Sequence, residues 1–128
     1  MIESCPDLER FLRGEVAASA FSHREHVRMG FEMLRRYDFA EAVFRYSRSL
    51  QRMAASAGKP QAFHQTVTVA FLALIAERID CGPCADFDAF ARHNADLLEK
   101  SALARWYSSE RLASEAARRT FILPAAAR

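Results

Sequence analysis

SHREHVRMGFEMLRRYDFAEAVFRYSRSLQRMAASAG, residues 22–58, is the stretch of sequence that decides the fold. Apolar residues recur in it at every third or fourth position, which is the spacing of a buried face on an α-helix. Ser22 and Asp38 are each followed three residues later by a glutamate, and this pattern is typical of a helix start. The stretch therefore predicts two consecutive helices, one ending near Tyr37 and one ending at Gly58.

Similar patterns continue on both sides of this stretch. A short helix is expected from residue 6 or 7 to residue 12 or 13, stopped by a glycine, and a helix apolar enough to be central is expected from Pro60 to about Ile79. Asp86 is expected to cap a helix over residues 87–91, followed by short helical pieces around residues 97–106 and a last helix from residue 114 toward residue 121. The predicted fold is all-α: a compact bundle of about four main helices plus short C-terminal helices.

Length and composition limit the class of protein. A chain of 128 residues with 51% hydrophobic residues suffices for one core, so a single helical domain over residues 1–128 is expected. Its formal charge of +2 is scattered along the chain, which argues against nucleic-acid binding. The longest apolar run, residues 69–76, is much shorter than the roughly 20 residues of a membrane span. With no basic-then-apolar N-terminal pattern, a cytoplasmic location and no membrane partner are predicted.

Three histidines are the best functional lead. His23 and His26 are three residues apart at the start of one predicted helix, so their rings share a side. His64 is expected in the first turns of the fourth helix, which begins at the same end of an antiparallel bundle. Three imidazoles with an open fourth position form a known catalytic metal arrangement for zinc, iron, copper or nickel. We therefore predict a metal site at His23, His26 and His64, with Glu25 orienting a histidine only if it is not used as a cap.

Other interpretations of the same residues stay open. Helix N-termini favour anions over cations, so the histidines can instead form a metal-free pocket for a small molecule or anion, with Thr66 and Thr68 adding hydroxyl groups. The histidines can also be structural, within a non-catalytic helical module that binds a protein partner. The sequence leaves a homodimer open and identifies no reaction.

Three motifs resemble those of a family of small bacterial all-α proteins without an assigned function. They are F-x-H-x-x-H at residues 21–26, an aromatic-H-x-T-x-T element at residues 63–68, and Y-S-x-E-x-L-x-S-x-x-A-R from residue 107 to residue 118. The resemblance implies a helical fold and no particular activity. It adds Tyr107 and Arg118 to Thr66 and Thr68 as candidate ligand-binding residues.

The cysteines suggest a weaker alternative. Cys81-Gly-Pro-Cys84 has the spacing of thioredoxin-like redox sites, but those sites follow a strand, whereas this motif follows a predicted helix. An odd number of cysteines without an export signal favours reduced thiols. We therefore interpret the motif as a loop between helices.

Overall fold

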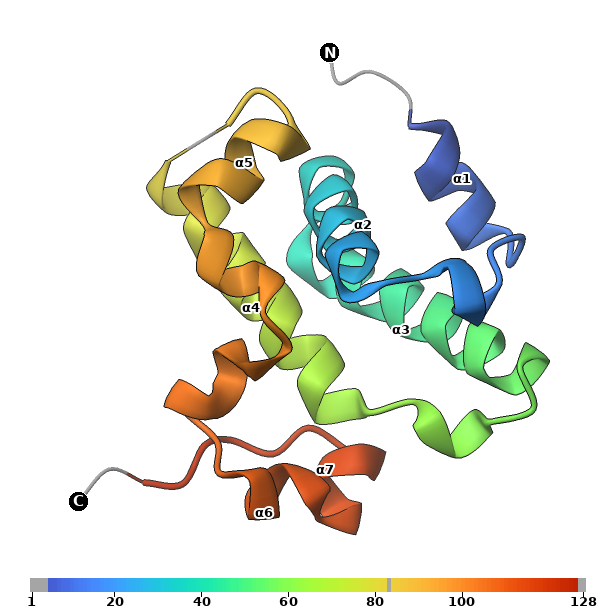
Figure 1. The fold of residues 1–128 in the computed structure, drawn as a ribbon, viewed down its shortest axis with the longest axis vertical. Coiled ribbons are helices and arrows are strands. Elements are labelled where there is room, and N and C mark those ends of the chain that lie inside the picture. The colour runs from blue at the N-terminus through green and yellow to red at the C-terminus, as the bar shows by residue number, and fades with distance from the viewer. Residues whose placement is uncertain (1–4, 83, 127–128) are drawn as a thin grey trace.

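The computed structural model describes residues 5–82 and 84–126, and within these ranges it contains helices and no strand, which confirms the all-α class (Figure 1). Three long helices dominate it: α2 (His23–Arg36), α3 (Phe39–Ser56) and α4 (Gln65–Cys81). The shorter elements are α1 (Pro6–Leu12), η1 (Ala18–Ala20), η2 (Pro60–Ala62), α5 (Phe87–His93), η3 (Ala95–Leu98), η4 (Lys100–Arg105), α6 (Ser109–Ala113) and α7 (Glu115–Arg119). None of the helices in the described ranges has the length and apolar character needed to cross a membrane.

The two predicted helix starts in the deciding stretch are confirmed. The Ser22 hydroxyl accepts a hydrogen bond from the amide of Glu25 at 3.3 Å, and the Asp38 carboxylate accepts one from the amide of Glu41 at 2.8 Å. Each bond satisfies a donor that the helix itself leaves free. The Glu25 carboxylate binds Arg28 instead of returning to the cap residue.

The expected start of the fourth helix at Pro60 is wrong. Pro60 opens only the single turn η2, and the chain then passes through extended backbone at Phe63 and His64 before α4 begins at Gln65. The ring of His64, at φ −132° and ψ 107°, accepts from the amide of Val67 and caps α4. His64 is therefore the residue that starts the helix, whereas the sequence analysis placed it inside the first turns.

Helix α2 lies between two groups of core side chains. On one side Met29 and Met33 pack with residues of α1 and α3, including Phe11. On the other side Val27 and Phe31 pack with residues of α4, α5 and η3. Burial on both sides explains why this helix carries apolar residues over more than one narrow stripe.

A glycine of α2 lies against side chains of α4. A Cβ atom at Gly30 would lie 3.0 Å from Cδ1 of Ile75 and 3.2 Å from Cδ2 of Leu72. The missing side chain lets the two helices approach here, at two residues of α4 that line the cavity described below.

The C-terminal segment is fastened over the start of α4. The Thr66 hydroxyl donates to the carbonyl of Thr120 at 2.8 Å and accepts from the amide of Ile122 at 3.1 Å. Because Thr120 is already extended, the predicted last helix toward residue 121 stops at Arg119. This segment closes the end of the molecule that contains His64.

Candidate functional site

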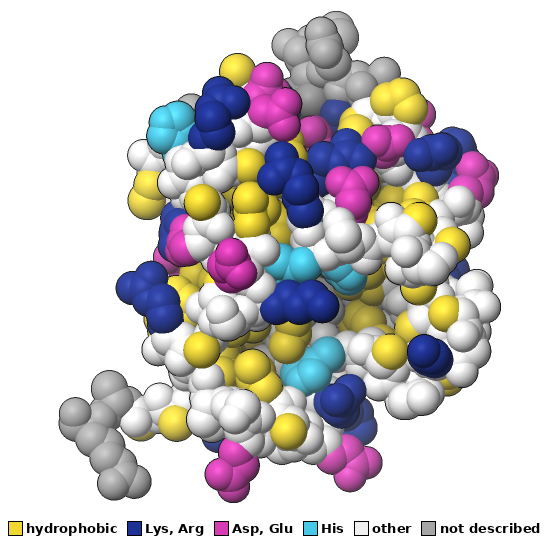
Figure 2. All heavy atoms as spheres, in the orientation of Figure 1, with side chains coloured by type: hydrophobic (Ala, Val, Ile, Leu, Met, Phe, Trp, Pro, Cys, Tyr) yellow, Lys and Arg dark blue, Asp and Glu magenta, His cyan; other side chains and the backbone are white. Residues whose placement is uncertain are grey.

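The three histidines of the sequence motifs line one cavity of about 460 Å³. Its walls come from η1 and the first turns of α2, from α3 between Tyr46 and its C-terminal end, from the connection between α3 and α4, and from α4 as far as Ile75. Lys100, the first residue of η4, completes the wall. Figure 2 shows this face of the molecule, where histidine and basic side chains gather at the centre over hydrophobic ones. The fold therefore brings His23, His26 and His64 together.

Both ring nitrogens of His64 are occupied. Nδ1 accepts from the amide of Val67 at 3.1 Å, so it carries no proton, and Nε2 lies 2.6 Å from the carbonyl oxygen of Leu112. A carbonyl oxygen only accepts, so Nε2 must carry the proton. His64 is thus a neutral ring with no lone pair left for a metal ion, and it ties the start of α4 to α6.

Only one ring nitrogen of His23 has a hydrogen-bond partner among the described residues. Its Nε2 lies 3.0 Å from the carbonyl oxygen of Leu97 and by the same reasoning carries the proton. The ring also contacts Phe71 edge-on, with 5.0 Å between ring centroids. These contacts fix the His23 ring between α4 and η3.

His26 differs from the other two because its ring has no hydrogen-bond partner among the described residues, while its edge meets Phe21 with 4.5 Å between centroids. Burial, with smaller effects from the nearby charges of His23 and Lys100, lowers the pKa of His26 to about 4. The ring is therefore neutral at pH 7 and offers both a donor and an acceptor to whatever enters the cavity.

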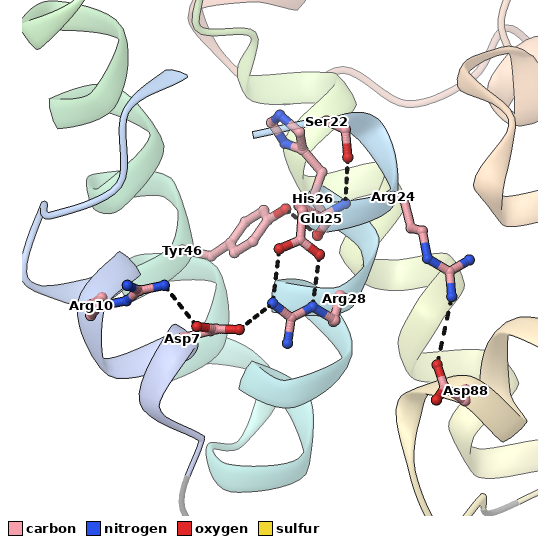
Figure 3. A network of polar contacts seen from close by, with 9 residues as sticks. All are labelled: Asp7, Arg10, Ser22, Arg24, Glu25, His26, Arg28, Tyr46 and Asp88. Carbon is pink, nitrogen blue, oxygen red and sulfur yellow. Dashed lines mark hydrogen bonds and ion pairs between the residues drawn. The ribbon is translucent and has the colours of Figure 1, made fainter. Parts of the chain in front are cut away.

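The backbone carbonyl of His26 accepts a hydrogen bond from a side chain of α3. The Tyr46 hydroxyl, on α3, donates to the carbonyl of His26 at 2.6 Å, and burial raises the pKa of this tyrosine, so it stays protonated (Figure 3). This bond gives a carbonyl group of α2 a second donor beside the helical amide and links α2 to α3 at the cavity.

Glu25 does not orient a histidine. Its carboxylate binds Arg28 through two hydrogen bonds of 2.7 and 2.8 Å, and Arg28 also binds Asp7 on α1 at 2.7 Å (Figure 3). The Arg28 guanidinium is the main cause of the lowered pKa of both carboxylates. This ion-pair network joins α1 to α2 and leaves the cavity without a carboxylate from this direction.

The remaining predicted ligand-binding residues divide into two groups. Thr68 lines the cavity, although its hydroxyl donates to the carbonyl of His64 at 2.7 Å. Thr66, Tyr107 and Arg118 lie outside the cavity lining and bind the backbone of their own chain. Thr66 binds the C-terminal segment as described above, the Tyr107 hydroxyl donates to Ile122 at 2.8 Å, and Arg118 donates to the carbonyl of Gln61 at 3.2 Å. In this structure these three residues fasten the C-terminal segment.

Two lysines were missed by the sequence analysis. Lys59 and Lys100, the only lysines in the chain, both line the cavity, whereas none of the lining residues is an aspartate or glutamate. The scarcity of lysine in a chain rich in arginine is visible in the sequence, whereas the position of both lysines at one cavity is not. The α3 part of the wall, formed by residues such as Leu50, Met53 and Ala54, carried no polar motif that would have marked it.

The histidines do not form a three-ring chelate, because His64 has no free ring nitrogen. Within residues 5–82 and 84–126, no group of three His, Cys, Asp or Glu side chains is placed to hold a metal ion. Cys5, Cys81 and Cys84 are all unpaired thiols. The three-histidine metal site stays a prediction, and it would require His64 to give up a helix cap.

Comparisons of the chain with protein-family models, with curated proteins and with solved structures each found no match. The resemblance to a bacterial helical family therefore stays a prediction.

Proposed function

We propose that the protein binds a small, mostly apolar molecule in the cavity bounded by α2, α3 and α4. The observation that carries the proposal is the composition of this one cavity. It gathers three of the four histidines and both lysines of the chain around walls that are otherwise mainly aliphatic and aromatic. A few polar groups set in an apolar wall are typical of small-molecule sites.

The size of the cavity supports the same function. A volume of about 460 Å³ lies within the usual range for ligand pockets. Phe21, Phe63 and Phe71 supply aromatic surface, and His26 supplies a ring whose nitrogens are not used by the described chain. An apolar ligand would gain from burial, and a polar group on it would find a partner at His26.

The contacts favour this function over the two alternatives. A metal site would need a free nitrogen on His64, which instead caps α4 and binds α6. A protein-interaction module with structural histidines would leave them dispersed, whereas His23, His26 and His64 line one cavity. Small-molecule binding is therefore the function that best accounts for the position of all three histidine rings at one cavity.

The test uses prodan, a neutral naphthalene dye whose emission moves to shorter wavelength in apolar surroundings. Wild-type protein should bind it saturably at one site. Ala54→Phe, which places a large ring in the cavity wall, should weaken binding at least tenfold, since it fills the space the dye needs.

The matched control is Ala55→Phe, because Ala55 is the next residue of α3 and is exposed on the outer side. Circular dichroism should show that both variants keep the helical fold. Absence of saturable binding to wild type, or equal binding by the two variants, would overturn the proposal.

A further inference from the structure

The charges at the cavity indicate more than an apolar ligand. Its lining residues include Lys59 and Lys100 but no aspartate or glutamate. Glu25, in the first turn of α2, is bound to Arg28 by two hydrogen bonds. The positive charges therefore have no negative partner within the cavity wall, and a negatively charged group on a ligand would supply one.

We propose that the ligand is an anionic amphiphile, an apolar chain or ring system that ends in a carboxylate, and that the carboxylate binds between Lys100 and His26. This inference rests on the proposed function and names the class of ligand. The apolar part lies along the α3 and α4 walls, and the acid group lies at the α2 end.

The two ends of the cavity differ in whether a histidine ring has a free nitrogen, and this difference indicates where the acid group binds. At the α2 end, the imidazole of His26 has no hydrogen-bond partner in the described chain and lies within electrostatic range of Lys100. At the other end, near Lys59, the ring nitrogens of His64 are both used. Only the α2 end therefore offers an ammonium group and an uncommitted ring N–H together.

The orientation of α2 favours the same placement. Its first turn, with Ser22, His23 and His26, forms part of the cavity wall, and a helix N-terminus carries a positive partial charge. Ser22 caps one free amide of this turn. The helix dipole adds to the charge of Lys100 and does not oppose it.

The test compares three molecules with the same ten-carbon chain by isothermal titration calorimetry at pH 7: decanoate, decanol and decylamine. Wild-type protein should bind decanoate about tenfold more tightly than decanol and should bind decylamine most weakly, because the apolar contacts are shared and the charge changes sign. Equal affinity for decanoate and decanol would overturn the inference while leaving the proposed function intact. Binding of none of the three molecules, together with no binding of prodan, would overturn both.

Two variants locate the acid group. Lys100→Gln and His26→Gln should each lower the affinity for decanoate about fivefold and change the affinity for decanol less than twofold. The charge control is Arg92→Gln, on the exposed surface of α5 and outside the cavity lining, which should leave both affinities unchanged. A larger loss of decanoate affinity in Lys59→Gln than in Lys100→Gln would overturn the placement.

Discussion

Replacing His26 by glutamine should make the protein less sensitive to acid. In the folded protein, burial lowers the pKa of His26 from its ordinary value of 6.5 to about 4. Between these two pH values the unfolded chain takes up a proton at this residue and the folded chain does not. The contribution of His26 to the free energy of unfolding is therefore fully present above pH 6.5 and decreases as the pH falls toward about 4. Below about pH 4 this residue causes no further loss of stability.

The size of the effect follows from the two pKa values. A pKa difference between 6.5 and about 4 corresponds to about 3 kcal/mol once the unfolded and the folded ring are both charged. Between pH 7 and about pH 4.5, about 2 kcal/mol of this is expressed, because the folded ring is then only beginning to protonate. The cavity lining contains two positively charged side chains, Lys59 and Lys100, and no carboxylate that would raise the pKa of His26.

The assay is urea unfolding at several pH values for wild type, His26→Gln and His93→Gln, the last being an exposed histidine on α5. From pH 7 to about pH 4.5, the free energy of unfolding should fall about 2 kcal/mol less in His26→Gln than in wild type, and His93→Gln should behave like wild type. A nuclear magnetic resonance titration of the His26 ring gives its pKa directly. A pKa of 6.5 or higher, or identical pH dependence in wild type and His26→Gln, would refute the reasoning.

Three further outcomes are expected. Thr66→Val should lower the free energy of unfolding by about 1–3 kcal/mol, because it removes both hydrogen bonds to the C-terminal segment, and limited proteolysis should then cleave that segment faster than in wild type. Gly30→Val should cost about 1–3 kcal/mol in chemical unfolding, since its Cβ would lie 3.0 Å from the Ile75 side chain, whereas Gly30→Ala should cost less because alanine favours the helix. Equimolar zinc should leave the Tm of wild type unchanged if His64 keeps its two hydrogen bonds. His64→Ala should lower the free energy of unfolding by about 1 kcal/mol, because the cap of α4 is lost. Zinc that binds stoichiometrically and raises the Tm of wild type but not of His64→Ala would support the metal site instead.

The helices that the sequence predicted well are those whose starts depend on local chemistry. Ser22, Asp38 and Asp86 each cap the helix expected of them, because a cap bond joins residues three apart and needs no distant partner. The start of α4 was misplaced for the opposite reason. Pro60 is compatible with a first turn, but the turn it begins is the separate η2, and His64 becomes a cap in a position also fixed by Leu112.

In the candidate site, too, features set by the spacing of residues could be predicted, whereas features set by contacts between distant residues could not. The F-x-H-x-x-H spacing places His23 and His26 on one side of α2, and this was enough to predict that they share a site. It could not show which ring would be free, because the carbonyl of Leu97 occupies His23 and the carbonyl of Leu112 occupies His64, and each lies far along the chain from its histidine.

Chemically similar residues thus acquire different roles from their distant neighbours. His64 becomes part of the scaffold because both nitrogens are used, whereas His26 stays available because none of the described residues hydrogen-bonds its ring. A ring that is partly buried, neutral and without a hydrogen-bond partner among the described residues costs stability on acidification and contributes no side-chain hydrogen bond to the fold. A ligand that accepts a hydrogen bond from His26 would supply the missing partner, so binding and acid stability should change together at this one ring.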